Sequence, residues 1–299
     1  MRTEWQTMEA VNYRPVRATE IDETVEIFLT AVTDMYRRHG INTPAPERAV
    51  IATYYRHTFE TGIYHVAEVG GRIAAVCHAV VRDHLWFLSG FWMLPEFQRR
   101  KIGGQLLRGV RAAGERAGAD TFFTWSSVDM TAMASYMKIG MLPGYQILTF
   151  GGALGRELPE QRSGYEVQPL EIANAIALDI EVRATGREVD HRFWLAQPSV
   201  KGRQLTSGGR VVGYYYVNHG VIGPAAWANA KDAEALIEAA CGEAGRDASQ
   251  VRLMIPGVNH AAIRFALENG LRLVAYSHLL TSAPFGMMEQ YLSSGPSLF

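Results

Sequence analysis

The sequence predicts a mixed α/β (α+β) protein made of two tandem domains, each with a central sheet flanked by helices. The chain has 299 residues, more than one ordinary domain, and 48% of them are apolar, enough to build real cores. Strand-like and helix-like segments alternate through the first half. Landmarks of that half return in the second half, which indicates a duplication.

Composition excludes several other classes. The 29 Lys and Arg residues balance 30 Asp and Glu residues, which argues against nucleic acid or a membrane surface as the main partner. The two cysteines, Cys77 and Cys241, do not make a disulfide framework. The first residues lack the apolar core of a signal peptide, and no run approaches the ~18 apolar residues of a membrane span. We therefore expect a cytoplasmic protein.

The first elements are a short strand and a long helix. Residues 13–18 alternate like a strand, and Thr19 with Asp22 three residues later is typical of a capping box. Apolar residues at helical spacing then predict an amphipathic helix that runs to Arg38. Gly, Asn and two prolines at residues 40–46 indicate a loop.

A hairpin and a third strand follow. Residues 64–69 and 73–81 read as a β-hairpin, because Gly70 and Gly71 supply the positive φ that its turn needs. Residues 85–94 form a further apolar, aromatic-rich strand. The half then closes with a helix, a strand and a short helix, at residues 103–117, 121–125 and 132–139.

The second half repeats these landmarks after a polar linker at residues 151–164. The Gly208-Gly209 pair repeats Gly70-Gly71 at a spacing of 138 positions. A helix frame also recurs at a spacing of 130 positions, with Asn259, Ala262 and Gly270 repeating Asp129, Ala132 and Gly140. The second copy has therefore lost a net eight residues between these landmarks. We expect an N-terminal catalytic domain at residues 1–155 and a degenerate C-terminal domain at 156–299.

The segment with the most chemical character lies where the second copy is shortened. It comes between a strand and an amphipathic helix and holds Gln98, Arg99, Arg100, Lys101, Ile102, Gly103, Gly104 and Gln105. A helix N-terminus presents unpaired backbone N–H groups, glycines leave the main chain accessible, and three cations add positive charge. These features suit a pyrophosphate. The alternative is a solvated basic turn before a surface helix.

This segment resembles the signature of the Gcn5-related N-acetyltransferase (GNAT) superfamily, Gln/Arg-x-x-Gly-x-Gly/Ala. Residues 98–103 occupy its positions, with Lys101 in place of the first glycine. A second family frame fits Asp129, Ala132, Tyr136, Gly140 and Met141, with Ser135 in place of an apolar residue. The resemblance covers residues 13–150. It implies a mixed, splayed sheet and acetyl-CoA as co-substrate.

The resemblance also implies site residues and a mechanism. The arm of acetyl-CoA would pair with the strand through Trp92, Met93 and Leu94, and a main-chain N–H near Met93 would polarise the thioester carbonyl. The residues of the basic turn and of the second frame, Asp129, Ser135 and Tyr136, would line the cofactor. An amine would attack directly in a ternary complex. Tyr136 is the candidate general acid for the departing thiolate.

Other features leave alternatives open. Glu96, Asp83 and His84 are candidate general bases, although each is a typical surface residue and water could relay the proton. The nine histidines show no metal-ligand spacing, so no metal is expected. Aromatic residues around Trp92 are typical of a core and a cleft wall.

The second half lacks the basic turn, and Ala266 stands where Tyr136 stands in the first. It resembles the degenerate half of YitH-like tandem acetyltransferases, more than it resembles mycothiol synthase. A charged group there either faces an acceptor or lies on a solvated helix and loop: Asp179, Arg183, Asp190, His191 and Arg192.

The expected function is acetyl-CoA-dependent N-acetylation of a primary amine, on a small molecule or a peptide. The rival class is a non-catalytic acyl-CoA-binding or regulatory protein, and a weaker reading is transfer of a longer acyl group. The sequence does not identify the acceptor or the oligomeric state, a homodimer included.

Overall fold

The computed structural model describes residues 10–159 and 162–299 and places them in two compact units. One unit holds the chain up to Val81 together with Leu88–Ala119. The other holds Arg82–Phe87 and Asp120–Phe299.

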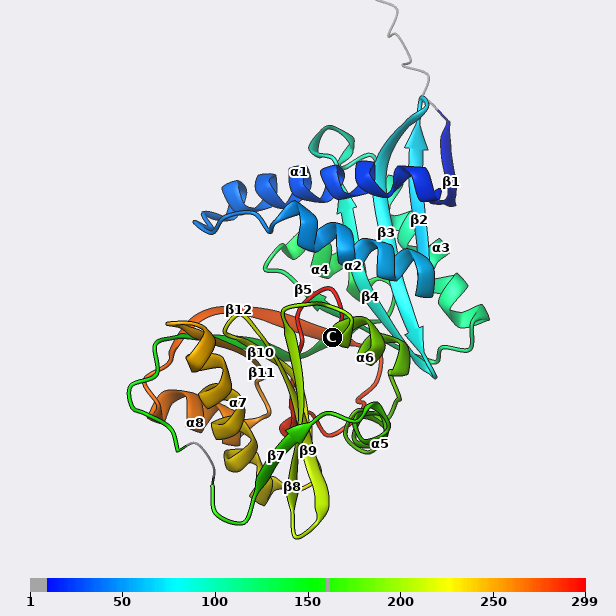
Figure 1. Ribbon diagram of the computed structural model, residues 1–299. Coiled ribbons are helices and arrows are strands. Elements are labelled where there is room, and N and C mark those ends of the chain that lie inside the picture. Colours follow the sequence, from blue (N-terminus) through cyan, green and yellow to red (C-terminus); the bar gives the residue numbers. More distant parts are fainter. Residues whose placement is uncertain (1–9, 160–161) are drawn as a thin grey trace, which may run out of the picture. The chain divides into compact units, whose positions relative to one another are not determined.

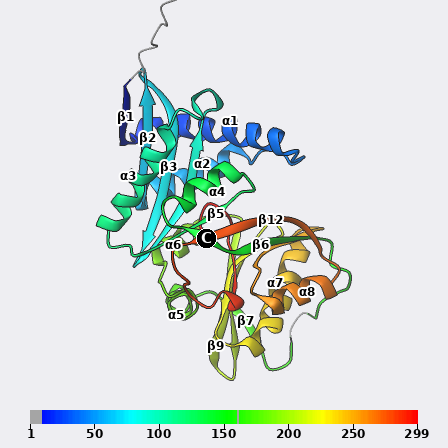
Figure 2. The ribbon, with the colours of Figure 1, turned by 180° about the vertical axis from the view of Figure 1, so that it is seen from behind.

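The first unit is a sheet with helices on both faces. Its strands follow the order β1 (Val11–Pro15), β2 (Ile63–Val69), β3 (Arg72–Arg82) and β4 (Leu85–Met93), of which β4 belongs to this unit from Leu88 on. Helices α1 (Ile21–His39) and α2 (Arg48–Thr61) cover one face (Figure 1). Helix α3 (Ile102–Arg116) covers the opposite face (Figure 2).

The predicted start of the first helix needs a correction. The capping box lies at Arg17 and Glu20, two residues before the predicted Thr19 and Asp22, and it opens the short 3₁₀ helix η1 (Ala18–Glu20) ahead of α1. Glu20 accepts a hydrogen bond from the Arg17 N–H at 2.8 Å and pairs with Arg14 at 2.8 Å. Arg14 holds the Glu20 carboxylate in place and lowers its pKa, whereas Asp22 is exposed on α1.

Helix α2 is absent from the sequence-based prediction. Its segment is rich in aromatic and β-branched residues, and its N-cap residue, Glu47, makes no side-chain cap. The burial of Ile51, Ala52 and Tyr55 decides in favour of a helix. Tertiary packing thus outweighs weak local propensity here.

Two Gly-Gly hairpins confirm the duplication. Gly70 and Gly71 have φ of 58° and 79°, and their repeat counterparts Gly208 and Gly209 have 56° and 74°. The pairing of β2 with β3 shifts register between Ala67 and Glu68. The pairing of β8 (Val200–Ser207) with β9 (Arg210–Asn218) shifts between Leu205 and Thr206, again 138 positions later.

The second unit is a larger sheet. Its strand order is β5 (Thr121–Ser126), β12 (Arg272–Thr281), β6 (Leu142–Gly152), β11 (Val251–Pro256), β10 (Val221–Trp227), β9, β8 and β7 (Glu166–Pro169), and β13 (Tyr291–Leu292) pairs with β10. Helices α7 (Ala233–Asp247) and α8 (His260–Glu268) pack together on one face, and α5 (Ile172–Arg183) and α6 (Glu188–Leu195) lie on the other (Figure 1). Helix α4 (Met130–Met137) contacts β6 and β12.

The strands of the two sequence repeats are interleaved in this sheet. Strand β12, the last long strand of the second repeat, pairs with β5 and β6 of the first. Strand β6 in turn pairs with β11 and β12 of the second repeat. Residues 151–152, predicted to begin the linker, are the end of β6 and pair with β11. Because the repeats exchange these strands, the boundaries of the two compact units do not fall between residues 155 and 156.

Candidate functional site

The predicted phosphate-binding segment is a strained turn at the start of α3. After the 3₁₀ helix η2 (Pro95–Phe97), Arg99 and Lys101 adopt φ of 63° and 64°, and α3 begins at Ile102. Left-handed residues in such a turn aim successive backbone N–H groups to one side, which makes an anion-binding nest. The first-turn N–H groups of α3 have no carbonyl of a preceding turn to bind. Lys101 thus takes the conformation of the glycine it replaces in the family signature.

The two glycines of this segment have different roles. A Cβ on Gly103 would lie 2.8 Å from Phe91 Cζ and 3.1 Å from Met93 Cε, so Gly103 is needed for the close packing of α3 on β4. A Cβ on Gly104 would meet only Arg108 Nη1, at 3.5 Å. Close ligand approach was expected at both positions, but the buried Gly103 serves helix packing.

The cations of the turn are exposed and available to a ligand. Arg99, Arg100 and Lys101 are exposed, and no carboxylate of residues 10–159 or 162–299 pairs with them. Arg100 stacks on the Phe97 ring at 5.3 Å, where Arg72 also lies, at 5.5 Å. The ring therefore holds a guanidinium beside the nest.

Two side chains tie the turn to the sheet. Gln98 Nε2 donates to the Met93 carbonyl at 3.3 Å, which joins the turn to the end of β4. The Tyr13 hydroxyl donates to the Ile102 carbonyl at 3.2 Å, and burial raises the pKa of this phenol. Tyr13 escaped sequence reasoning because nothing along the chain links β1 to a helix 89 residues later.

Strand β4 leads directly into this turn. Trp92 and Met93 are half-buried, and Trp92 packs edge-on against Phe28 of α1 at 4.8 Å. Leu94 is buried, and its N–H donates to Ala74 of β3 at 3.0 Å. Gln105 is exposed on the first turn of α3. The end of β4, the turn and the first turn of α3 thus follow one another without a break within the first unit.

Residues of the second family frame lie in the second unit. Asp129 caps α4, because its carboxylate accepts hydrogen bonds from the N–H groups of Thr131 at 2.9 Å and Ala132 at 3.1 Å. Asn259, its counterpart in the second repeat, caps α8 in the same way, by accepting a hydrogen bond from the Ala262 N–H. Tyr136 is 7% exposed near the end of the same helix. Ser135 is half-buried, and its hydroxyl donates to the Thr131 carbonyl at 2.9 Å.

The candidate bases occupy ordinary structural positions. Glu96 lies on the surface of the first unit and pairs with Arg72 at 2.8 Å. Asp83, with φ of 49°, lies in the turn before β4 in the second unit. Its carboxylate accepts from the Gly186 N–H and the Thr185 hydroxyl, both at 2.9 Å. His84 is half-buried beside it.

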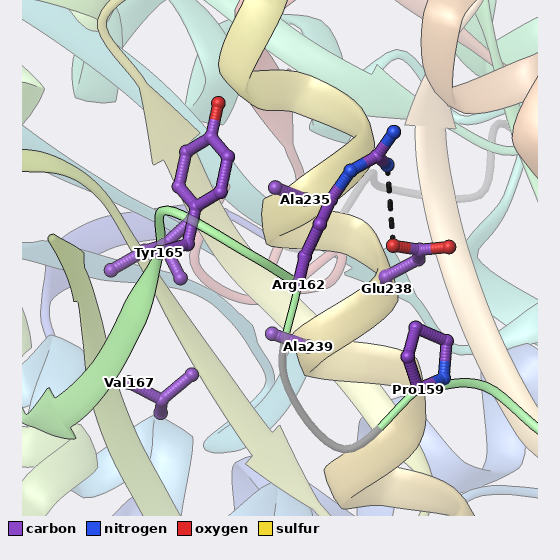
Figure 3. A pocket seen from close by; sticks show the side chains of 8 residues that line it. Pro159, Arg162, Tyr165, Val167, Ala235, Glu238 and Ala239 are labelled. Atoms are coloured by element: carbon purple, nitrogen blue, oxygen red, sulfur yellow. Dashed lines mark hydrogen bonds and ion pairs between the residues drawn. The ribbon is translucent and has the colours of Figure 1, made fainter. Parts of the chain in front are cut away.

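The second repeat has lost the turn. Its 3₁₀ helix η3 (Ala230–Asp232) runs straight into α7, with no residues in place of 98–101. Asp232 is buried at that junction and accepts a hydrogen bond from the Tyr165 hydroxyl at 2.9 Å. A cavity of about 10 Å³ beside α7, lined by Tyr165, Arg162 and Glu238 among others, has room for about one water (Figure 3).

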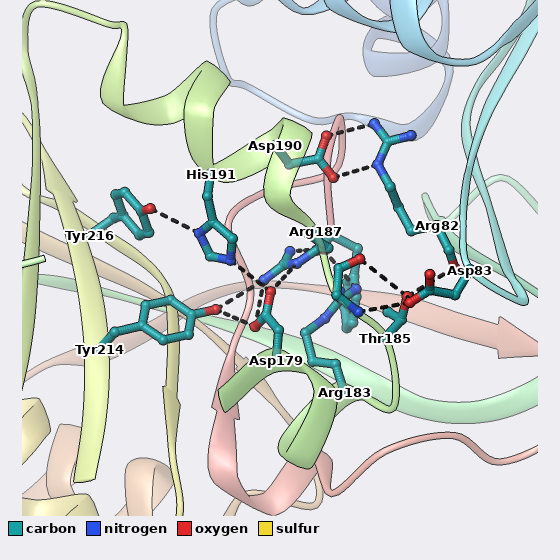
Figure 4. A network of polar contacts seen from close by, with 12 residues as sticks. Arg82, Asp83, Asp179, Arg183, Thr185, Arg187, Asp190, His191, Tyr214 and Tyr216 are labelled. Atoms are coloured by element: carbon teal, nitrogen blue, oxygen red, sulfur yellow. Dashed lines mark hydrogen bonds and ion pairs between the residues drawn. The ribbon is translucent and has the colours of Figure 1, made fainter. Parts of the chain in front are cut away.

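The charged group predicted in the second repeat is neither solvated nor open to an acceptor. Asp179, Arg183, Asp190 and His191 are at most 2% exposed, and only Arg192 lies on the surface. These charged side chains are buried because they form ion pairs and hydrogen bonds within the fold (Figure 4). This corrects both readings of the group.

Asp179 is the centre of this buried network. Its carboxylate accepts hydrogen bonds from Arg187 at 2.7 Å, His191 at 2.9 Å and Tyr214 at 2.5 Å. Burial alone would raise the pKa of Asp179, but Arg187 and His191 hold it below its ordinary value. Arg82 pairs with Asp190 through two bonds of 2.8 and 2.6 Å. The network fastens α5 and α6 to β9 and to the turn before β4.

An open hollow lies beside α1 in the first unit. It measures about 450 Å³ and is lined by Leu29, Thr30, Thr33, Asp34, Arg37 and Pro95. Asp34 accepts hydrogen bonds from Arg38 at 2.8 Å and Arg37 at 2.7 Å, which lower the pKa of its carboxyl. Since Pro95 lies two residues after the end of β4, the hollow adjoins the segment that leads to the nest.

Comparison with known proteins agrees with this geometry. Residues 42–141 match the model of the acetyltransferase (GNAT) family. This part of the chain is therefore similar to GNAT-family acetyltransferases. No curated protein matches the chain by sequence.

Solved structures show the same fold over 91–100% of the chain. A candidate acetyltransferase from Pyrococcus horikoshii superposes with a TM-score of 0.77 at 17% identity, over 100% of this chain and 99% of that one. A GCN5-related N-acetyltransferase from Sphaerobacter thermophilus superposes with a TM-score of 0.64 at 13% identity, over 91% of this chain and 95% of that one. A tandem GNAT protein from the clavulanic acid biosynthesis pathway superposes with a TM-score of 0.58 at 14% identity, over 92% of this chain and 99% of that one. The chain thus has the fold of tandem GNAT proteins.

No helix in residues 10–159 or 162–299 is both long and apolar enough to cross a membrane. Within the same residues, no three His, Cys, Asp or Glu side chains gather as a metal site would require.

Proposed function

We propose that the chain is an N-acetyltransferase that moves the acetyl group of acetyl-CoA to a primary amine by direct attack in a ternary complex. The nest at Arg99 and Lys101 carries this proposal, because it combines a left-handed turn, a conformation typical of anion-binding nests, with three exposed cations. The match of residues 42–141 to the acetyltransferase family supports it independently.

The protein contributes to the reaction in three ways. The turn at residues 98–105 binds the diphosphate of CoA through main-chain N–H groups and the Arg100 guanidinium. A main-chain N–H of β4 near Met93 stabilises the oxyanion that forms when the amine attacks the thioester carbonyl. Collapse of this intermediate breaks the C–S bond, and the phenol of Tyr136 protonates the thiolate that leaves.

The acceptor enters by the hollow beside α1. Its walls combine the hydroxyl groups of Thr30 and Thr33 with the Asp34 and Arg37 pair. Such a surface favours a small polar amine. A water in this hollow takes the proton that the ammonium group of the acceptor must lose before its nitrogen can attack. The nitrogen loses a second proton when the intermediate collapses, and this proton restores the Tyr136 phenol by way of water. Glu96 is not assigned the role of base, because it pairs with Arg72.

A charge reversal in the turn tests the proposal. Arg100→Glu should weaken CoA binding at least tenfold in low salt, measured by calorimetry, because it places a carboxylate beside the diphosphate. Arg116→Glu, at the far end of the same helix, is the matched control and should change Kd less than twofold. Equal affinities of the two variants would contradict the proposed site.

A second assay separates transfer from binding alone. Acetyl-CoA is incubated with pooled primary amines, and released CoA is measured with a thiol reagent. Release that depends on an amine supports acetyl transfer. Binding without release from any pool would instead identify a non-catalytic acyl-CoA-binding protein.

A further inference from the structure

Two parallel strands of the second repeat separate after a short pairing. Strands β10 and β11 pair only at Val221 with Arg252 and at Ile222 with Leu253. Gly223, with φ of 128°, and a register shift between Ile222 and Ala225 then turn β10 away. Diverging strands leave main-chain N–H and C=O groups on their inner edges, and buried groups of this kind need partners.

The chain's own segment β13 provides these partners. Leu292 pairs with Ala225, and Tyr291 pairs with Ala226, so the segment runs antiparallel to β10. On its other side, the Ser293 N–H donates to the Met254 carbonyl of β11 at 3.0 Å. The segment thus bridges both strands.

A side chain of α8 and the packing hold the segment in place. Asn259, the N-cap residue of α8, donates through Nδ2 to the Tyr291 carbonyl at 3.0 Å. Tyr291, Leu292 and Ser293 are fully buried. A Cβ on Gly223 would lie 2.2 Å from the Ser293 carbonyl oxygen, which shows how closely the chain segments approach. A second molecule could not share this space.

The repeat identifies what this gap corresponds to. Strands β4 and β10 both follow a Gly-Gly hairpin and a turn with a left-handed residue, Asp83 at 49° and His219 at 45°. Both lead through a 3₁₀ helix into a helix of 15 residues, α3 or α7. β10 is therefore the counterpart of β4, beside which the arm of acetyl-CoA is proposed to lie.

We propose that residues 291–293 are a built-in peptide replacement for the arm of acyl-CoA in the second repeat. The segment satisfies the same two strand edges with main-chain hydrogen bonds and closes the gap permanently. The chain then binds one CoA, in its first repeat. This inference rests on the proposed function for the identity of the ligand, whereas the closure itself rests on the contacts of β13.

Three measurements on the full chain test it. Calorimetry with CoA should give one site per chain, and Arg100→Glu should weaken it. Hydrogen exchange of peptides that cover residues 289–294 should be slow and unchanged by saturating CoA. Leu292→Ala should lower Tm by about 5–15 °C, because it empties a fully buried position. Leu267→Ala, on an exposed leucine of α8, is the control and should lower Tm by about 2 °C or less.

The outcomes separate this inference from the proposed function. Two CoA sites per chain, faster exchange of the segment when CoA is added, or an unchanged Tm of Leu292→Ala would each overturn the permanent closure. If CoA does not bind at all, the proposed function fails, and exchange and Tm alone then decide whether the gap is closed.

Discussion

At the scale of single residues, His78 shows how burial sets a chemical property. It is 1% exposed in the first unit and packs against the rings of Tyr55 at 4.5 Å and Tyr64 at 4.6 Å. Its edge lies against β4, since a Cβ on Gly90 would be 2.2 Å from Nε2. Burial lowers the pKa of His78 to about 3.

This pKa predicts a loss of stability in acid. The folded chain keeps His78 neutral, while the unfolded chain takes up a proton near pH 6.5, so stability falls as the pH drops from about 6.5 towards 3. One such group contributes a slope of about 1.4 kcal/mol per pH unit. Urea unfolding between pH 7.5 and 4.5 measures it. His78→Phe should flatten the dependence, although burial also lowers the pKa of His65 and His191. An unchanged slope would contradict the assignment.

Tyr136 carries a prediction about turnover. Tyr136→Phe should lower kcat about 10–1000-fold, because the departing thiolate loses its proton donor. Affinity for acetyl-CoA should change little, since the ring remains. Steady-state kinetics and calorimetry measure the two effects separately. Retention of wild-type kcat would remove Tyr136 from the mechanism.

At the scale of elements, the turn before α3 combines strain with charge. Lys101 has φ of 64°, a conformation that costs a residue with a side chain about 1 kcal/mol and costs glycine little. Lys101 therefore lowers the local stability of the turn but places a cation at the nest.

Lys101→Gly tests this trade. The variant should raise the free energy of unfolding by about 0.5–1 kcal/mol and weaken CoA binding several-fold. Lys138→Gly is the control: Lys138 has φ of −63° at the end of α4, so glycine should destabilise there. Thermal unfolding and calorimetry provide the readouts. A lower Tm for Lys101→Gly would mean that the side chain itself stabilises the turn.

At the scale of the whole molecule, the interleaved strands make the repeats depend on each other. Strand β12 separates β5 from β6 over pairs that include His278 with Ser126 and Ser277 with Ile147. A chain of residues 1–155 lacks β12, so the inner edges of both strands lose their partners.

Residues 1–155 should therefore not fold alone. We expect an aggregated or partly folded product by circular dichroism and gel filtration, and recovery of a soluble complex when residues 156–299 are produced in the same cells. A monomeric fragment 1–155 with a cooperative unfolding transition would contradict this interdependence.

The sequence predicted the elements whose cause is local. Gly70-Gly71 and Gly208-Gly209 require left-handed turns, so both hairpins and the duplication could be read from the chain. The turn at residues 98–104 was recognisable because its glycines and cations are adjacent. Helix α2 and strand β6 were missed, because distant packing decides their conformation.

By itself, the sequence determined two repeats, the loss of residues from the second, and the segment that makes the nest. Only the tertiary structure decided that β6 and β12 are exchanged, that Asp179 and its partners are buried, and that residues 291–293 fill the gap of the second repeat. The physical reason is the distance along the sequence between the residues that interact. Turn conformation and helix capping depend on neighbouring residues, whereas strand pairing and burial depend on residues far apart in the sequence, such as Asp179 with Tyr214, 35 positions later, or Ser126 with His278, 152 positions later.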